Sequence, residues 1–146
     1  MTAIKESIEI SRRPEDVFAY IDDLARHGEW QESIVSSHVD TDGPTRVGSR
    51  ATEVRRMGSR EQTMTYEVTG HDPPRVFAFR GTDGPASGRP GTIEPVGDGS
   101  SSRVTLELDF AGHGFGKLLA PLAGSQARKQ VPKDHQRLKE RLESEV

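Results

Sequence analysis

Arg50 and Arg56, near the middle of the chain, are the residues whose type and expected position could support catalysis. If residues 50–57 form a strand, Arg50, Val54 and Arg56 share one of its faces, because side chains alternate between the faces of a strand. An arginine that faces an apolar interior is costly unless it is paired, and its planar group could hold a carboxylate or enolate oxygen through two hydrogen bonds. The alternative, which we favour, is that both arginines lie near strand ends and reach water. Arg56 is therefore only a weak candidate for a catalytic group.

Aromatic and other large apolar residues are expected around the same interior. Residues 60–70 alternate most clearly, with Met64, Tyr66 and Val68 on one side and threonine or glutamate on the other. Such side chains offer large contact areas to a flat ligand, although they could equally be plain core. Trp30 is expected at the entrance of the ligand cavity that these side chains would line. The predicted ligand-binding residues are Trp30, Val54, Arg56, Met64, Tyr66, Phe77, Phe79, Leu119 and Leu122.

Several other chemistries find little support in the residue types. The chain has no cysteine, which excludes thiol nucleophiles, and its 5 histidines lack the spacing of metal ligands. The glycines at 112, 114 and 116 are not followed by the Gly-Lys-Ser/Thr ending of a phosphate-binding loop. We therefore expect neither a metal nor a cofactor.

Length and charge limit the class of protein. A chain of 146 residues is expected to form one domain, 1–146. Its net charge of −3 gives no general attraction to nucleic acids or anionic membranes. No run approaches the roughly 18 apolar residues of a membrane span, and the first residues lack the apolar stretch of a signal peptide. The sequence thus predicts a cytoplasmic protein that binds no nucleic acid and makes no stable membrane insertion. It leaves open whether the protein is a monomer or a homodimer.

Strand patterns fill the first three quarters of the chain. Residues 3–10 place isoleucines at period two, and Pro14 suits the first turn of a short helix. A second short helix is expected to end near Trp30. Between residues 33 and 110, alternating runs separated by Gly, Pro and Asp turns predict about six more strands, each with one apolar and one polar face.

The last part of the chain has a helical period. Val131, His135 and Leu138 lie on one stripe of this predicted helix, and Pro132 is expected to kink or interrupt it. The helix is the only predicted element long enough to cover the concave face of a twisted sheet. We therefore predict an α+β fold in which a curved antiparallel sheet of about seven strands wraps around this helix and leaves a cavity.

Several segments resemble one known superfamily. The most distinctive is the run Ser-Arg-Arg-Pro-Glu-Asp-Val-Phe at 11–18, within the matching segment 8–23. Further matching segments are 29–30, 47–50, 66–68, 72–75, 94–99 and 138–143. Together they resemble the polyketide cyclase/dehydrase branch of the START-like (SRPBCC) superfamily over nearly the whole chain. This resemblance implies the helix-grip fold, with two short helices after the first strand.

The resemblance predicts the fold more specifically than it predicts the function. The superfamily includes aromatic polyketide cyclases, lipid and sterol carriers, hormone receptors and chaperone-binding regulators, so it implies a cavity for a small hydrophobic ligand without naming the ligand. We favour a carrier or sensor of an aromatic, polyketide-like or lipid-like molecule. The first alternative is a cofactor-free cyclase, aromatase or dehydratase, in which the resemblance implies that Arg56 polarises a carbonyl and Tyr66 moves protons. The second alternative is a partner-binding regulator.

Overall fold

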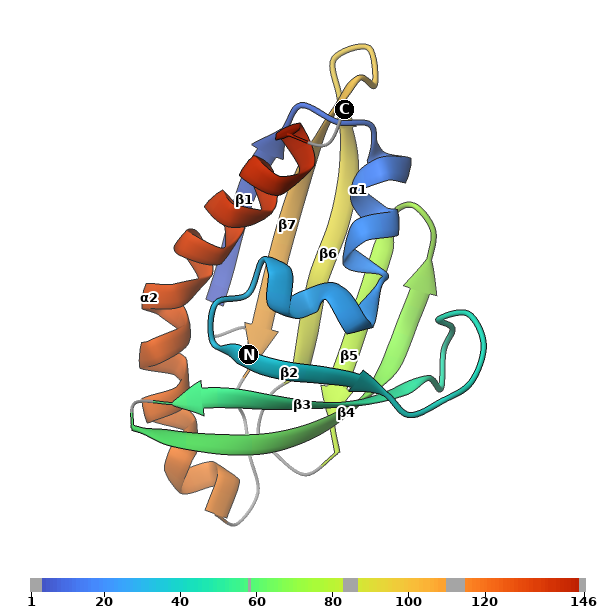
Figure 1. Ribbon diagram of the computed structural model, residues 1–146. Helices are drawn as coiled ribbons and strands as arrows, with labels where there is room; N and C mark the ends of the chain where they lie inside the picture. Colours follow the sequence, from blue (N-terminus) through green and yellow to red (C-terminus); the bar gives the residue numbers. More distant parts are fainter. Residues whose placement is uncertain (1–3, 58, 83–86, 110–114, 145–146) are drawn as a thin grey trace.

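The architecture is that of a curved sheet with helices on its concave side. The computed structural model describes residues 4–57, 59–82, 87–109 and 115–144, with the backbone only at 57, 87–90, 109 and 115–127. In Figure 1 the sheet is curved and the helices lie on its concave side. None of the helices in these ranges is long and apolar enough to cross a membrane.

Seven antiparallel strands form one sheet in the order β1-β7-β6-β5-β4-β3-β2. Their bounds are β1 (Ile4–Ile10), β2 (Ile34–Val39), β3 (Arg50–Met57), β4 (Arg60–Asp72), β5 (Val76–Gly81), β6 (Ser87–Val96) and β7 (Ser101–Asp109). The strands β2 to β7 follow one another as neighbours, and β1 returns to pair with β7. The first and second strands therefore lie at opposite edges, and the connection between them crosses the concave side.

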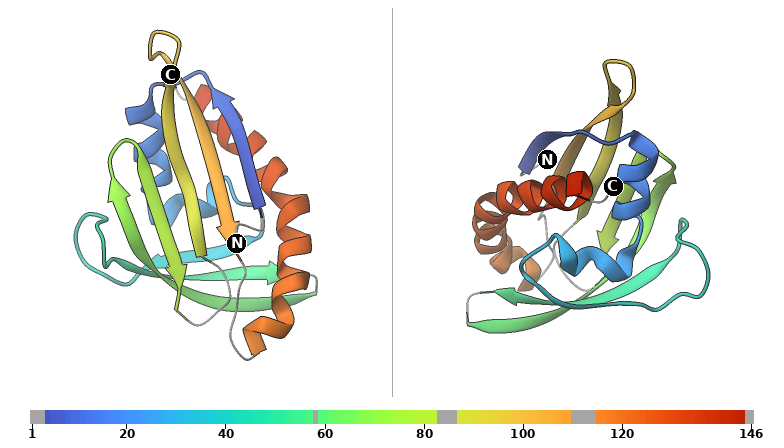
Figure 2. Two further views of the ribbon diagram at one scale, coloured as in Figure 1. Left: turned by 180° about the vertical axis from the view of Figure 1, so that it is seen from behind. Right: turned by 45° about the horizontal axis from the view of Figure 1, so that its top comes forward.

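That connection consists of two short helices. Helix α1 (Pro14–Ile21) starts with proline in its first turn, followed by Glu15 and Asp16, which favour the positive end of the helix dipole. The 3-10 helix η1 (Leu24–Glu29) follows after two residues. Both predicted helices are thus present, and the views in Figure 2 show them on the same side of the sheet as the C-terminal helix.

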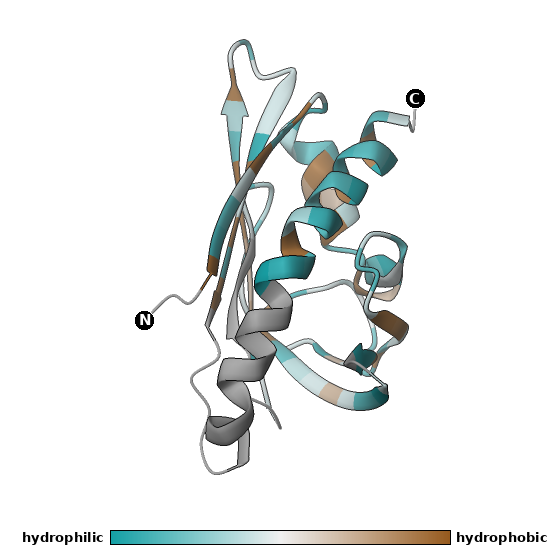
Figure 3. Ribbon diagram, turned by 90° about the vertical axis from the view of Figure 1, so that its left-hand side faces the viewer, coloured by the Kyte–Doolittle hydropathy of each residue, from teal (hydrophilic) through white to brown (hydrophobic). Residues whose placement is uncertain are grey.

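The C-terminal helix α2 (Phe115–Ser144) lies along β1 and is amphipathic in its described part. Val131, His135 and Leu138 are buried, as their shared stripe predicts, whereas the outward side is mainly hydrophilic (Figure 3). Of the kink or interruption expected at Pro132, the interruption is wrong, because α2 continues through this residue. Proline removes one backbone donor, and packing of buried residues on both sides of it can offset that loss.

Register shifts help the sheet to curve. Between Val68 and Gly70, β4 has one residue more than its partner β5, and opposite Phe77–Phe79, β6 has one residue more than β5. Such bulges bend a strand and increase its twist. Gly70 allows a close approach at its bulge, since a Cβ atom there would lie 3.0 Å from Cβ of Ala78. This close approach lets β4 and β5 stay paired through the bend.

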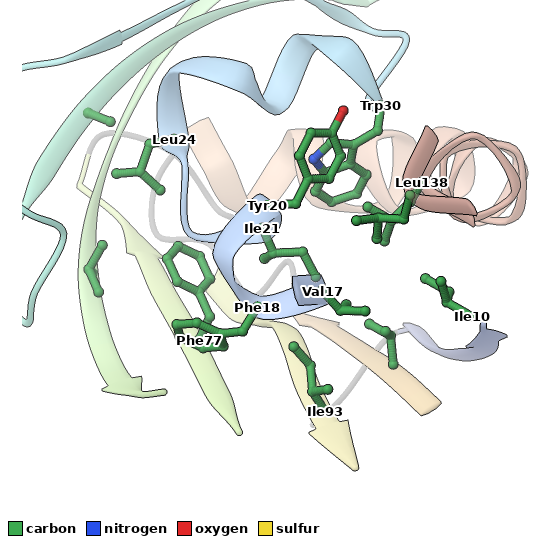
Figure 4. Close-up of a cluster of buried hydrophobic side chains, with 14 of the residues drawn as sticks. Ile10, Val17, Phe18, Tyr20, Ile21, Leu24, Trp30, Phe77, Ile93 and Leu138 are labelled. Carbon is green, nitrogen blue, oxygen red and sulfur yellow. The ribbon is translucent and has the colours of Figure 1, made fainter. Parts of the chain in front are cut away.

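The main core lies between the sheet and all three helices. It combines α1, η1, the inner sides of the central strands, and Leu138 and Leu142 of α2. Figure 4 shows ten of its residues with labels, including Phe77 from the sheet and Trp30 from the end of η1. A smaller cluster of Ile4, Leu106 and Val131 fixes α2 against β1 and β7. The fold predicted from the sequence is therefore confirmed, and its interior is built from elements at both ends of the chain.

Candidate functional site

The inner face of β3 differs from the prediction. Ala51 and Glu53 are buried and Arg55 is half-buried, whereas Arg50 and Arg56 are exposed. Val54 and Arg56 lie on the opposite face from Glu53, so their placement among the inward-facing residues is wrong. The exposure of Arg50 and Arg56 agrees with the favoured alternative that both reach water. The two faces of this strand are almost equally polar, so alternation alone could not choose between them.

Pairing with β4 determines which face of β3 points inward. Tyr66 lies opposite Ala51, Met64 opposite Glu53, and Met57 opposite Arg60. Directly opposed residues share a face of the sheet, so the inner face of β4 selects the odd-numbered residues of β3. The sequence held this signal: a two-residue connection at Gly58-Ser59, combined with the clear alternation of β4, would have identified Glu53 and Arg55.

The half-buried Arg55 and the buried Glu53 form an ion pair on this inner face. The Nε atom of Arg55 donates to Oε1 of Glu53 at 2.7 Å, and Glu53 is only 5% exposed. The other two guanidinium nitrogens donate to Oγ of Ser33 at 2.9 Å and to Oε1 of Gln31 at 2.6 Å. The arginine is thus held by three partners, which fix the position of the carboxylate beside it.

Tyr66 is buried next to this pair. Its ring lies edge-on to Phe79, with ring centroids 5.5 Å apart. Burial raises the pKa of the Tyr66 hydroxyl, and the nearby charge of Glu53 raises it further. The hydroxyl therefore keeps its proton at neutral pH and is suited to donate a hydrogen bond.

Trp30 lies deep in the interior and not at an entrance. It follows η1, its side chain is almost completely buried, and its ring meets the ring of His27 edge-on with centroids 5.7 Å apart. Figure 4 draws it in the same buried cluster as Leu138 of α2. The indole therefore packs between η1 and α2.

Helix α2 adds two buried titratable groups. Burial lowers the pKa of His135 to about 4, so its ring is neutral at pH 7. Burial also raises the pKa of Asp134, whose Oδ1 accepts from the backbone N–H of Glu32 at 3.1 Å and from Nε2 of Gln130 at 2.9 Å. These contacts join α2 to the segment that precedes β2.

Four buried polar atoms have no hydrogen-bond partner within the described part of the chain. They are Nε1 of Trp30, Oε2 of Glu53, the hydroxyl of Tyr66 and Nε2 of His135. Buried polar groups in proteins nearly always have partners, so four such atoms in one small domain need an explanation. The indole can only donate and the carboxylate of the ion pair can only accept, while the hydroxyl and the imidazole can do either. Glu53 and Tyr66 lie on the same inner face of the sheet, whereas Trp30 follows η1 and His135 belongs to α2.

The remaining predicted residues fall into three groups. Phe77 is buried, with its ring 6.2 Å from that of His27, and Phe79 packs on the core beside Tyr66. Met64 is half-buried on the same face as Glu53. The side chains of Leu119 and Leu122 lie outside the described residues. No group of three or more His, Asp or Glu residues in the described ranges is placed to hold a metal ion.

An open pocket lies on the surface, where α1 and η1 meet the end of α2. It has a volume of about 220 Å³ and is lined by Arg12, Asp16, Ala19, Tyr20, Arg26 and Leu142. The guanidinium group of Arg26 lies 4.8 Å from the ring centre of Tyr20 and pairs with Glu29. This pocket is formed by charged groups with mutual partners and differs in character from the inner face of β3 and β4.

Comparison with solved structures defines the class of fold. The chain superposes on a START superfamily protein from Mycobacterium smegmatis with a TM-score of 0.77 and 14% identity, covering 98% of both chains. It superposes on the Zhui aromatase/cyclase from Streptomyces sp. R1128 with a TM-score of 0.80 and 14% identity, covering 96% of this chain and 92% of that one. A curved seven-stranded sheet with a long C-terminal helix is the START-like helix-grip fold.

Sequence comparison then gives the family. The chain belongs to the family described as polyketide cyclase / dehydrase and lipid transport, which matches residues 1–145. It is also similar to the uncharacterized protein Rv1546 of Mycobacterium tuberculosis (strain ATCC 25618 / H37Rv), with 29% identity over 133 residues, 88% of this chain and 87% of the relative.

Proposed function

We propose that this protein binds a small, largely apolar molecule between the inner face of β3 and β4 and helix α2, as a carrier or sensor. Ligand sites of this kind are mainly apolar and contain a few convergent polar groups. Tyr66, Phe79 and Met64 supply apolar surface on the sheet, and the family description includes lipid transport.

The observation that carries the proposal is the set of four buried polar atoms without partners among the described residues. Leaving a buried donor or acceptor unpaired costs about 1–3 kcal/mol for each group. A chain whose only requirement was stability would gain by replacing them with apolar groups of similar shape. A bound molecule that supplies hydrogen bonds would account for their retention.

A cofactor-free cyclase or dehydratase in the same space is the second candidate. The fold similarity to an aromatase/cyclase and the buried Tyr66 favour it. The arginine that it required, Arg56, is however exposed on the outer face, and Arg55 on the inner face has its nitrogens committed to three neighbours. Binding therefore has stronger support than catalysis.

Native mass spectrometry and thermal shift measurements across a panel of lipids, quinones and aromatic polyketides test the proposal. We expect at least one class to give a stoichiometric complex and a raised melting temperature. A ligand bound to the native state alone raises stability in proportion to the logarithm of its concentration over Kd, about 2.7 kcal/mol at a hundredfold excess over Kd. The proposal fails if no class gives either signal.

A matched pair of variants locates the binding site. Met64→Trp fills space on the inner face beside Glu53, and Thr63→Trp makes the same change at the neighbouring exposed position. We expect Met64→Trp to weaken binding of any ligand from the panel by tenfold or more, about 1.4 kcal/mol, and Thr63→Trp to leave it unchanged. Equal effects from the two variants would place the binding site elsewhere.

A further inference from the structure

The carboxylate of Glu53 uses only one of its two oxygens. Oε1 accepts from Arg55, whereas Oε2 is buried and has no partner in the described ranges. A carboxylate can accept through both oxygens and cannot donate while it is ionised. The free oxygen is therefore a buried acceptor that requires a donor.

The surroundings of Glu53 show which donors the protein itself can supply. Its ionic partner Arg55 is held by Ser33 and Gln31, so the guanidinium cannot turn to cover the second oxygen without breaking those bonds. The residue opposite Glu53 in β4 is Met64, which has no donor. Tyr66 lies one position further along the same face, and its hydroxyl is itself without a partner.

The charges near this oxygen also disfavour an anion. Arg55 is ion-paired with Glu53 and also acts on the carboxyl group of Asp134, so its charge is shared between two buried acids. A ligand carboxylate placed beside Glu53 would meet a like charge in a poorly solvated site, where repulsion between charges is strong. A neutral hydroxyl group would instead donate to the free oxygen in a short, charge-assisted hydrogen bond.

From this geometry we propose that the ligand carries a neutral hydroxyl group that donates to Oε2 of Glu53, and that the site rejects apolar molecules that end in a carboxylate. This inference rests on the proposed function, because it names the chemistry of a molecule bound at the same site. The proposed site would bind hydroxylated rings and alcohols and would reject fatty acids and aromatic acids, although all of these molecules are otherwise apolar enough to enter the site.

Four probes of one ring size test the inference: naphthalene, 2-naphthol, 2-methoxynaphthalene and 2-naphthoate. Titration calorimetry at pH 7 measures the affinity of each probe. Naphthalene is the ring alone and 2-naphthol adds a hydroxyl donor. The probe 2-methoxynaphthalene has the same oxygen without its proton, and 2-naphthoate is an anion. We expect 2-naphthol to bind about tenfold more tightly than 2-methoxynaphthalene and at least that much more tightly than 2-naphthoate.

Glu53→Gln and the matched control Glu61→Gln complete the test. Both replace a glutamate of the hairpin by its amide, but Glu61 is exposed at the start of β4. We expect Glu53→Gln to reduce the preference for 2-naphthol over 2-naphthoate to about threefold or less, because the amide bears no charge and can also donate. Glu61→Gln should leave the preference as in the parent protein.

The outcomes separate the two proposals. If 2-methoxynaphthalene or 2-naphthoate binds as tightly as 2-naphthol, the proposal of a ligand hydroxyl group that donates to Glu53 is wrong, whereas the ligand-binding function stands. If none of the four probes binds, the hydroxyl proposal is overturned, whereas the ligand-binding function is still decided by the panel of lipids, quinones and aromatic polyketides. The comparison among probes needs no substitution, so it decides the question even if Glu53→Gln fails to fold.

Discussion

Arg55 donates from Nε to Oε1 of Glu53 at 2.7 Å, across two positions of one strand that point to the same face. Breaking such a pair from one side leaves a buried charge without compensation, whereas replacing both partners by apolar residues is often neutral. We therefore expect Arg55→Met to lower the free energy of unfolding by about 3 kcal/mol and the double variant Glu53→Met/Arg55→Met to recover most of that loss. Urea denaturation of the single and double variants measures the coupling.

Arg56→Met is the control for this cycle. Arg56 is the next residue along the strand, but it is exposed on the outer face. Surface substitutions away from special features usually change stability by about 0.5 kcal/mol or less, and we expect that here. A similar loss for Arg55→Met and Arg56→Met would mean that the assignment of faces in β3 is incorrect.

The stability of the protein should fall between pH 6.5 and pH 4.5 because of its buried histidines. Burial lowers the pKa of His135 from 6.5 to about 4, and burial also lowers the pKa of His27. As the pH falls below 6.5, the unfolded chain takes up protons at these rings while the folded protein does not. The stabilisation of the folded state relative to the unfolded state is thus full above the unfolded pKa and is lost as the pH falls towards the folded pKa.

For His135 this loss amounts to about 3 kcal/mol in total, since one pKa unit corresponds to about 1.4 kcal/mol. His135→Leu should remove that part of the pH dependence. Urea midpoints at pH 7, 5.5 and 4.5 test this, with His38→Leu, on the exposed side of β2, as the control. An unchanged slope in His135→Leu would show that the ring is not buried as a neutral group.

The sequence predicts which face is buried in β4 but not in the neighbouring strand β3. In β4, Tyr66 and Val68 alternate with threonine and glutamate, so the buried face follows directly from the residue types. In β3, one face carries Arg50 and Arg56 and the other carries Glu53 and Arg55, so hydrophobicity gives no preference. Only the register with β4, a contact outside the strand itself, decides which arginine is inside.

Two further differences have the same physical origin. Trp30 is expected at an entrance because the short helices near it would close the mouth of the cavity, yet packing against η1 and α2 buries the whole side chain. Pro132 is expected to kink or interrupt a helix because of its local backbone cost, yet α2 continues through it. Local preference predicts the type of element well, whereas tertiary packing decides burial.

The contact of Gly70, at the bulge of β4, with Ala78 of β5 gives a prediction about stability. A Cβ at Gly70 would lie 3.0 Å from Cβ of Ala78, so Gly70→Ala should overpack this contact and cost about 1–3 kcal/mol. Adding Ala78→Gly removes the opposing atom and should restore part of the loss. Thermal unfolding of the two variants and of the exposed control Thr69→Ala measures the effect. No recovery in the double variant would mean that the cost arises from the backbone of β4 and not from this contact.

The single tryptophan of the chain provides a direct optical test of the interior. Trp30 is 2% exposed, so its emission should be shifted to short wavelength and should resist quenching by iodide until the protein unfolds. Because Nε1 has no partner among the described residues, Trp30→Phe should cost less than the usual loss for a large buried aromatic residue, as it removes an unpaired donor together with part of the ring. A ligand that accepts a hydrogen bond from the indole should change the emission of the parent protein and bind Trp30→Phe several-fold more weakly. Emission at long wavelength, or quenching as strong as that of free tryptophan, would contradict the burial on which the candidate site depends.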